Sequence, residues 1–257
     1  MKRGQVSIFI IVGILIIAAL IFFFAFKGKI MPQQISSENI NPNIFLEACI
    51  EDKVKETAEI IGIQGGYVEP QFSKKFKFSD ETDYSEISYL CYTENYYVPC
   101  VMQQPMLIQH IKNEIKNEIK NEVKDCYDNL IAGLQKENYE VNSKYRDFEI
   151  EFIPKRINVN IDAEISMKKN EVGSNQKGFK VSVNSYLYDL STIAQEILSQ
   201  EGEYCNFEQV GFMLLNPGFE LDKFKTGDSD TIYTLKHKKS KEIFRFAVRG
   251  CVIPAGM

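Results

Sequence analysis

The feature that most limits the fold of this chain is an uncharged apolar run near its N-terminus, QVSIFIIVGILIIAALIFFFAF, residues 5–26. At about 1.5 Å per residue, a helix of this length reaches about 33 Å, enough to cross a hydrocarbon core of about 30 Å. A secretory signal peptide has a shorter apolar region, and small residues at a cleavage site follow it. Here Ala18 and Ala19 lie inside the run. We therefore expect a transmembrane helix over residues 5–26.

The charges on the two sides of this run predict its orientation. Lys2, Arg3 and the α-amine precede it, whereas Lys27 and Lys29 follow it. Because cytoplasmic flanks are the more positive ones, the small excess places the N-terminus inside. We expect a single-pass protein of the cell membrane that contacts the lipid bilayer through residues 5–26, with the bulk of the chain extracytoplasmic.

The remainder of the chain divides into a tether and an acidic domain. Residues 27–41, KGKIMPQQISSENIN, are polar and contain a proline, which predicts a tether before a domain over residues 42–257. The first 32 residues hold four basic residues and no acid, so all 35 acidic residues stand against 26 basic ones in the rest. Nucleic-acid phosphates bind basic surfaces, so this composition argues against a nucleic-acid partner.

Three segments have helical patterns. Asn41 as N-cap and Pro42 in the first turn begin a helix that continues to Gln64. Its apolar stripe consists of Leu46, Ile50, Val54, Thr57 and Ile61. A second helix opens at Pro105, and apolar residues recur at steps of three or four from residue 108 to residue 134. The third is DLSTIAQEILSQEG, residues 189–202, with Ser191 or Asp189 at its start.

The second helix contains the four-residue repeat KNEIKNEIKNEV, residues 112–123. A step of four places its lysines and glutamates on separate slanting stripes, with like charges at i,i+4, which costs a few tenths of a kcal/mol per pair. Two interpretations remain open. The helix over residues 108–134 pairs with a protein partner whose stripes have the opposite order, or it is an amphipathic helix packed on its own domain.

After Tyr145 the apolar period changes to two, which indicates strands. FEIEFIPKRINVNIDAEISM predicts a half-solvated strand, NEVGSNQKG a turn, and FKVSVNSYLY the return strand. VGFMLLNPGFEL predicts a further strand, and DTIYTLKHKKSKEIFRFAVRGCVI a hairpin that turns at KKSK. The expected fold class is α+β: an N-terminal transmembrane helix, then an ectodomain with two or three helices and a mostly antiparallel sheet, with a subdivision near residue 140.

Six cysteines predict disulfides rather than a metal or redox site. No two of them have the C-x₂-C spacing, and no histidine lies near any of them. An even number outside the membrane favours disulfides, although six cysteines allow about fifteen connectivities. We prefer Cys91–Cys100 by proximity, Cys49–Cys126 between the first two helices, and Cys205–Cys251 within the C-terminal half. Six unbridged thiols are the alternative.

Other candidates for chemistry lack the partners that they need. His110 has Glu114 one turn later, but no third and fourth metal ligand follow. Asp228 and Asp230 in KTGDSDT lack the rest of a calcium loop, so we expect a turn with side-chain hydrogen bonds there. His237, at the hairpin end, is predicted to be solvated. The sequence predicts no metal and no cofactor.

The usual catalytic motifs, such as G-x-S-x-G and H-E-x-x-H, do not occur in the chain. Carboxylate pairs such as Glu149 and Glu151 alternate along a strand, which suits a solvated sheet face equally well. We therefore predict no catalytic residues and no enzyme, and a carboxylate-based extracellular hydrolase is the alternative.

The segment CYTENYYVPC, residues 91–100, is the most binding-like stretch. Tyrosine offers rigid apolar area with a polar tip, which recognition surfaces favour, although tyrosine is also common in strands. We predict an interaction patch around this loop, with a protein partner, made by Tyr84, Tyr89, Tyr92, Tyr96 and Tyr97.

The leader KRG followed by QVSIFIIVGI resembles archaeal class III signal peptides, the type IV pilin-like kind. In that family a dedicated peptidase cleaves after the glycine, and the hydrophobic helix stays on the mature protein. The resemblance implies a basic leader over residues 1–4 and cleavage between Gly4 and Gln5. Pilin subunits usually have a glutamate at the fifth mature position, where this chain has Phe9. The whole chain also resembles uncharacterised membrane-anchored surface proteins of small-genome archaea.

These observations predict a membrane-anchored extracytoplasmic protein with a structural or surface-interaction role. The first alternative is a pilin-like filament subunit, against which Phe9 weighs. The second alternative is the carboxylate-based hydrolase.

Overall fold

The computed structural model describes residues 41–79, 81–170 and 172–253, which belong to one compact unit that begins at Asn41. The predicted leader, its cleavage site between Gly4 and Gln5, the predicted span over residues 5–26 and most of the tether lie outside the described residues. Within the described ranges, no helix is both long enough and apolar enough to cross a membrane.

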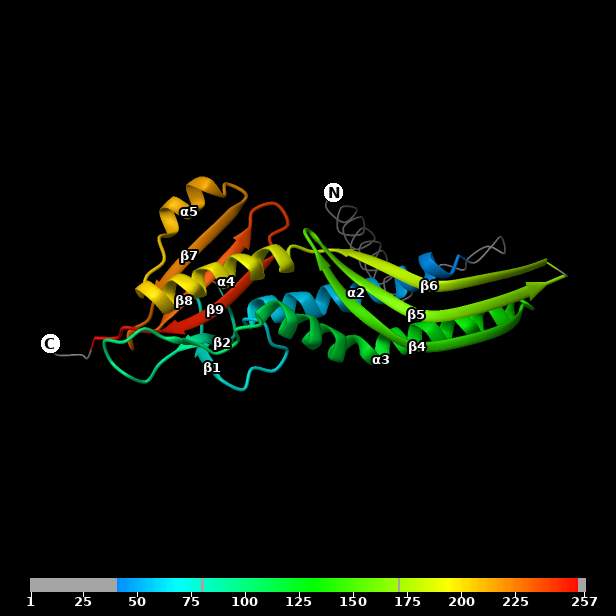
Figure 1. Cartoon of the computed structure of the whole chain (residues 1–257), viewed down its shortest axis with the longest axis horizontal. Helices are drawn as coiled ribbons and strands as arrows, with labels where there is room; N and C mark the ends of the chain where they lie inside the picture. The colour runs from blue at the N-terminus through cyan, green and yellow to red at the C-terminus, as the bar shows by residue number, and fades with distance from the viewer. Residues whose placement is uncertain (1–40, 80, 171, 254–257) are drawn as a thin grey trace, which may run out of the picture. The chain divides into compact units, whose positions relative to one another are not determined.

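The described part of the chain has an α+β fold (Figure 1). Its helices are α2 (Pro42–Ile63), α3 (Leu107–Lys136), α4 (Leu187–Tyr204) and α5 (Gln209–Leu215). Its strands are β1 (Ser73–Phe76), β2 (Ser85–Tyr92), β3 (Val101–Met102), β4 (Glu140–Ile153), β5 (Arg156–Lys169), β6 (Val172–Asn184), β7 (Phe219–Lys225), β8 (Thr231–His237) and β9 (Ile243–Arg249). The α+β class and the mostly antiparallel pairing are confirmed, with one helix more than predicted.

The first two helices form where the sequence predicts them. The side chain of Asn41 accepts a hydrogen bond from the backbone N–H of Asn43 at 3.0 Å, so it caps α2 as expected. The apolar stripes of α2 and α3 are both buried, and the two helices pack against each other. Their packing follows directly from the 3.6-residue period of the two stripes.

Strands β4, β5 and β6 form an antiparallel sheet against which α2 and α3 pack (Figure 1). The predicted inward face of β5 is confirmed, because Ile157, Val159, Ile161, Ala163 and Ile165 are all buried. The prediction of one long strand over residues 148–167 was wrong. The chain instead turns back between β4 and β5 at Pro154 and Lys155, where Lys155 has a φ of 67°. β6 likewise begins earlier than predicted, at Val172.

The second sheet is mixed. Its strand order is β1-β2-β9-β8-β7, and β3 also pairs with β2. The pairing of β2 with β9 is parallel, whereas the other pairings are antiparallel. Helix α4 packs against β9, β8 and β2. The hairpin of β8 and β9 that KKSK predicted is confirmed.

The segment VGFMLLNPGFEL does not form the strand that was predicted for it. Helix α5 occupies its first part, and β7 begins only at Phe219. The side chain of Glu208 caps this helix by accepting hydrogen bonds from the backbone N–H groups of Val210 and Gly211, at 2.9 and 3.4 Å. A short apolar run does not distinguish a helix from a strand by its period, which explains the error.

Helix α4 begins at Leu187, two residues before the predicted start. Neither predicted cap acts as one: Ser191 lies buried inside the helix, and Asp189 accepts from the backbone N–H of Lys155 at 2.8 Å. The hydroxyl of Ser185 instead accepts from the N–H of Leu187 at 3.1 Å. The N-cap itself is Tyr186, which makes no side-chain cap hydrogen bond. Ser185 lies outside the periodic segment, so the pattern did not reveal this contact.

The charged repeat on α3 has partners on both sides within this domain. The ammonium of Lys116 donates to Asp147 at 2.8 Å and to Glu149 at 2.9 Å, both on β4. On the other side, Lys53 of α2 donates to Glu118 at 2.9 Å. Lys116 of the lysine stripe thus pairs with two acids of β4 and Glu118 of the glutamate stripe pairs with a lysine of α2, which supports the interpretation of an amphipathic helix packed on its own domain.

Candidate functional site

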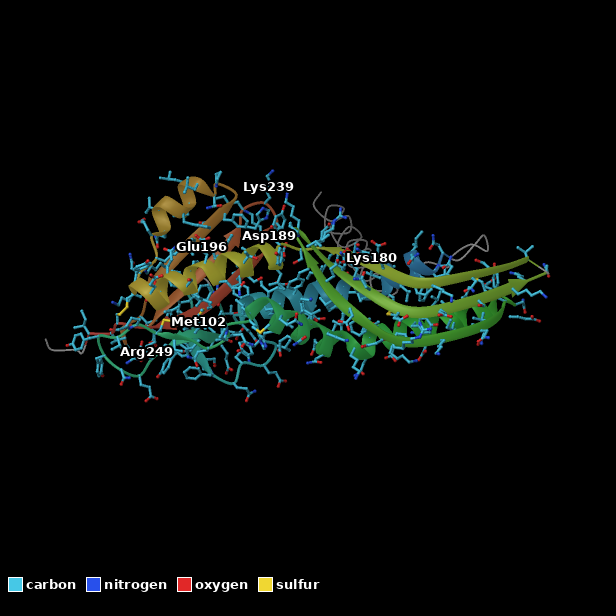
Figure 2. All side chains as sticks on the ribbon, in the orientation of Figure 1. Met102, Lys180, Asp189, Glu196, Lys239 and Arg249 are labelled. Atoms are coloured by element: carbon cyan, nitrogen blue, oxygen red, sulfur yellow. A yellow bond between two sulfur atoms is a disulfide. The ribbon has the colours of Figure 1, made fainter. Side chains whose placement is uncertain are left out.

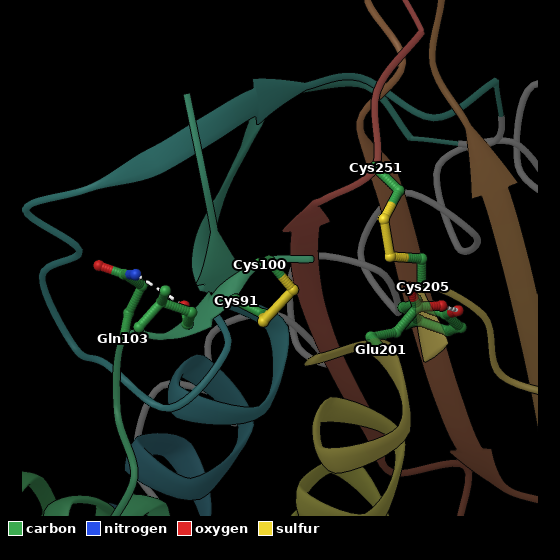
Figure 3. Close-up of a disulfide and its surroundings, with 8 residues drawn as sticks. Cys91, Cys100, Gln103, Glu201, Cys205 and Cys251 are labelled. Carbon is green, nitrogen blue, oxygen red and sulfur yellow. Dashed lines mark hydrogen bonds between the residues drawn. A yellow bond between two sulfur atoms is a disulfide. The ribbon is translucent and has the colours of Figure 1, made fainter. Parts of the chain in front are cut away.

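All six cysteines are paired. The disulfides are Cys49–Cys126, Cys91–Cys100 and Cys205–Cys251, with Cα–Cα distances of 5.9, 5.3 and 5.9 Å. These distances lie within the usual range, and the pairs coincide with the three preferred from the sequence. Figure 3 shows Cys91–Cys100 and Cys205–Cys251 in one view, at the ends of β2 and α4.

Two of these disulfides enclose a loop at one end of the mixed sheet. We call residues 93–100 the tyrosine loop and residues 250–253 the tail. The backbone N–H of Cys251 donates to Val98 O at 2.7 Å, and that of Tyr97 donates to Val252 O at 3.1 Å. The loop is closed at its base by Cys91–Cys100, and the tail beside it is joined to the end of α4 by Cys205–Cys251.

Large apolar side chains are exposed on this loop and beside it. Seven of them, each between 39 % and 68 % exposed, form what we call the loop surface: Tyr96, Tyr97, Val98, Val101, Met102, Met106 and Ile253. They come from the tyrosine loop, from β3 and the residue before α3, and from the tail. Figure 2 shows Met102, which belongs to this surface, and Arg249, which precedes the tail, at the same end of the sheet. Scattered exposed apolar residues are ordinary, whereas contiguous apolar patches are typical of interaction sites.

The five tyrosines of the predicted patch do not all lie on this surface. Tyr96 and Tyr97 do, but Tyr84 precedes β2 and is separated from the loop by the whole of that strand. Tyr92 is half-buried, and its ring lies 5.1 Å from that of Tyr89. The prediction was wrong for Tyr89, which is buried in the core. Because β2 is covered on the face that Tyr89 occupies, this side chain cannot reach a partner.

A buried carboxylate explains the position of Tyr89. Its hydroxyl donates to Asp230 at 2.7 Å, and the same carboxylate accepts from Lys74 at 2.8 Å and from Arg249 at 3.3 Å. Burial and the adjacent carboxylate of Asp230 raise the pKa of Tyr89 far above its ordinary value. Since Arg249 directly precedes the tail, this network fixes the residue at which the tail leaves the sheet.

Asp228 extends the same network to the surface. Its carboxylate accepts from Lys74 and, at 2.6 Å, from the hydroxyl of Thr226. The hydrogen bonds from Lys74 and Thr226 lower the pKa of Asp228 from 3.8 to about 2. The predicted turn with side-chain hydrogen bonds is confirmed for Asp228, and Asp230 has the additional role of a buried ion-pair partner.

A second buried acid lies under the other disulfide of this region. Glu201 is one turn before Cys205 on α4 (Figure 3), and its carboxylate accepts from the hydroxyl of Tyr233 and from Lys223, the latter at 3.3 Å. Burial and this carboxylate raise the pKa of Tyr233 far above its ordinary value. Glu201 therefore holds a tyrosine hydroxyl and one cation, which ties α4 to the sheet, and Asp230 holds a tyrosine hydroxyl and two cations, which ties strands of the sheet together.

The carboxylates of β4 that suggested a hydrolase also have partners. Glu149 pairs with Lys116. Glu151 accepts from the amide of Asn158 at 3.0 Å and from Lys180 at 3.3 Å, and these hydrogen bonds lower its pKa. Such contacts are those of a solvated sheet face.

His110 and Glu114 are directed to different partners. Glu114 accepts from the backbone N–H of Val68 at 2.9 Å, and the ring of His110 lies 4.2 Å from that of Tyr67. Burial lowers the pKa of His110. The carboxylate of Glu114, which could have shared a metal with His110, thus accepts a hydrogen bond from a backbone N–H instead.

His237 is buried, which corrects the prediction that it is solvated. Its ring stacks on Tyr186 with 3.5 Å between the ring centroids, and its Nδ1 accepts from the N–H of Ser240 at 3.2 Å. Burial lowers its pKa. A position at the end of a hairpin does not show whether the start of a helix covers it, so this stacking could not be derived from the local sequence.

The loop surface has the character of a recognition site. It combines backbone held by two disulfides with exposed aromatic and aliphatic side chains, a combination that interfaces favour. Comparisons with protein-family models, curated proteins and solved structures found no match to this chain.

Proposed function

We propose that this chain is a single-pass, membrane-anchored extracytoplasmic protein with a surface-interaction role, and that it contacts a protein partner through the loop surface. The observation that carries this proposal is the exposure of seven large apolar side chains around a loop whose backbone is held on both sides. A rigid loop loses little conformational entropy on binding, so its apolar area is available for affinity.

Two further observations support the proposed location. All six cysteines are paired, and disulfides persist in oxidising compartments outside the cytoplasm. The apolar run over residues 5–26 is long enough to anchor the chain in a bilayer. We propose that the N-terminus is inside and that the leader is removed between Gly4 and Gln5.

Site-specific photo-crosslinking in cells tests the interaction. A photoreactive residue in place of Val101, which is 67 % exposed on β3, is expected to capture a discrete partner. The matched control is the same residue at Asn117, which is exposed on α3 and does not belong to the loop surface. Val101→Asp with Met106→Asp is expected to abolish capture by a crosslinker at position 97. Equal crosslinking from positions 101 and 117 would contradict the proposal.

Intact-mass measurement of the native protein tests the location. A chain that starts at Gln5 and takes up no alkylating agent until it is reduced is the expected result. Six thiols that alkylate without reduction would contradict the extracytoplasmic location.

A further inference from the structure

A cleft of about 410 Å³ opens away from the loop surface, where α2, the junction of β6 with α4, and the turn between β8 and β9 meet. Its volume is within the range of small-molecule sites, about 300–1,000 Å³. Its floor is apolar and includes Ala58, Ile63, Leu187, Leu190 and Ile243. Nothing in the loop surface or its supporting network uses these residues.

Small residues on α2 account for this space. At Gly62 an added Cβ would lie 2.3 Å from the carbonyl oxygen of Ile243, so the helix approaches β9 closely there. One turn earlier, Ala58 faces the cleft with only a methyl group. Gly62 thus lets α2 pack directly on β9 next to the cleft, and the short side chain at position 58 leaves space above the floor.

Two of the four charged residues that line the cleft have structural partners. Glu242 accepts from the hydroxyl of Ser185 and from the backbone N–H of Tyr186, both at 2.7 Å, so it holds the start of α4. Lys55 pairs with Glu51 on its own helix at 2.5 Å. Glu242 and Lys55 are therefore already paired with groups of the domain itself.

The other two charges, Glu59 on α2 and Lys241 on the turn between β8 and β9, line different walls of the cleft. Among the described residues, neither takes part in an ion pair or a side-chain hydrogen bond. The cleft thus presents one unpaired acid and one unpaired base above an apolar floor. A molecule that carries an ammonium, a carboxylate and an apolar group would match these features.

We propose that this cleft binds a small apolar zwitterion, of the chemical class of leucine, phenylalanine or a dipeptide of such residues. The ammonium pairs with Glu59, the carboxylate pairs with Lys241, and the side chain lies on the floor beside Ala58. Because the opposite charges come from separate walls, the ligand joins α2 to the β8–β9 turn. This inference does not rest on the proposed interaction role.

Calorimetric titration of the full-length chain in detergent tests the proposal. L-leucine, L-phenylalanine and Leu-Leu are the probes, and N-acetyl-leucine and leucinamide each lack one charge. At least one zwitterion is expected to bind, and removal of either charge is expected to weaken binding about tenfold. Tighter binding of Leu-Leu than of leucine would indicate that the ligand is a dipeptide. Tighter binding of leucine would indicate a free amino acid.

Variants locate the site. Ala58→Leu fills the floor and is expected to abolish binding, whereas Ala132→Leu, the same change at an exposed position of α3, leaves it intact. Glu59→Gln is expected to weaken the binding of leucinamide but not that of N-acetyl-leucine. Lys241→Met is expected to weaken the binding of N-acetyl-leucine but not that of leucinamide. Glu47→Gln and Lys239→Met are the matched charge controls. Circular dichroism verifies that each variant is folded.

Three results would overturn the proposal. They are no binding of any probe up to about 10 mM, equal binding by the wild type and a folded Ala58→Leu variant, and equal binding of charged and neutralised probes.

Discussion

The backbone N–H of Cys251 donates to the carbonyl oxygen of Val98 at 2.7 Å, which couples the tail to the tyrosine loop. Cys251 and its disulfide partner Cys205 both have positive φ angles, 48° and 55°, a region that residues other than glycine seldom adopt. At Gly250 an added Cβ would lie 3.0 Å from the backbone nitrogen of Cys100. The tail is therefore held against the loop by its disulfide, its hydrogen bonds and a close backbone contact.

Loss of the Cys205–Cys251 bridge is expected to loosen the tyrosine loop without unfolding the sheet. In Cys205→Ser with Cys251→Ser, the two residues can leave their unfavourable φ region, and the hydrogen bonds to Val98 and Tyr97 weaken. Hydrogen exchange of amides in residues 93–100 should become faster, while that of β8 stays slow. The control is Cys49→Ser with Cys126→Ser, and equal exchange in the loop of both variants would contradict the coupling.

Two of the three disulfides are expected to differ in their effect on stability. Cys49–Cys126 spans 77 residues and Cys91–Cys100 only 9. In the chain-entropy model the first bridge stabilises by about 4–5 kcal/mol and the second by about 2.5–3 kcal/mol. Denaturant titration of the two double-serine variants measures both values, and a larger loss on removing Cys91–Cys100 would contradict this order.

Two glycines in helices are expected to respond in opposite directions to alanine. Gly62→Ala places a Cβ against the backbone oxygen of Ile243, so α2 must shift, at a cost of about 1–3 kcal/mol. At Gly133 on α3, nothing lies within 4 Å of an added Cβ. Gly133→Ala should therefore stabilise by about 0.5–1 kcal/mol through helix propensity. Thermal unfolding measures the change in stability of both variants. Stabilisation by Gly62→Ala would contradict the close approach of α2 to β9.

Stability is expected to fall at acid pH because of Asp228. Its pKa in the folded chain is about 2, below its ordinary value of 3.8. The folded state therefore binds this proton less readily than the unfolded state, and the stabilisation is present above about pH 4 and lost as pH falls toward 2. The difference in unfolding free energy between the wild type and Asp228→Asn should shrink across this window. Asp222→Asn, at an exposed position of β7, is the control. The same pH dependence in both variants would contradict the role of Asp228.

Periodicity and capping were sufficient to predict α2 and α3, since their stripes and the Asn41 cap are local features. The sheet was harder to derive, because period-two apolar residues stand on both sides of Pro154 and Lys155, from Phe148 in β4 and from Ile157 in β5. A period-two pattern shows which face of a strand is apolar, but it does not show where the chain turns back.

The tyrosine patch shows the same limit at the level of a site. Tyr89 and Tyr96 look alike in the sequence, yet Tyr89 is buried against Asp230 and Tyr96 is half exposed. Asp230 is 141 residues further along the chain, so no local pattern could place it there. The cleft beside Ala58 was missed for the same reason, because its three walls come from distant segments.

The sequence by itself determined the two long helices and the α+β class, because these depend on period and composition within short stretches. Among the cysteine pairs only Cys91–Cys100 follows from short spacing, whereas Cys49–Cys126 and Cys205–Cys251 join residues 77 and 46 positions apart, which only folding brings together. Only the tertiary structure decided the parallel pairing of β2 with β9, the burial of Tyr89 and His237, and the contact of the tail with the tyrosine loop. These features depend on which distant segments share a core. That choice is made by the packing of the whole domain, not by the local pattern of any one element.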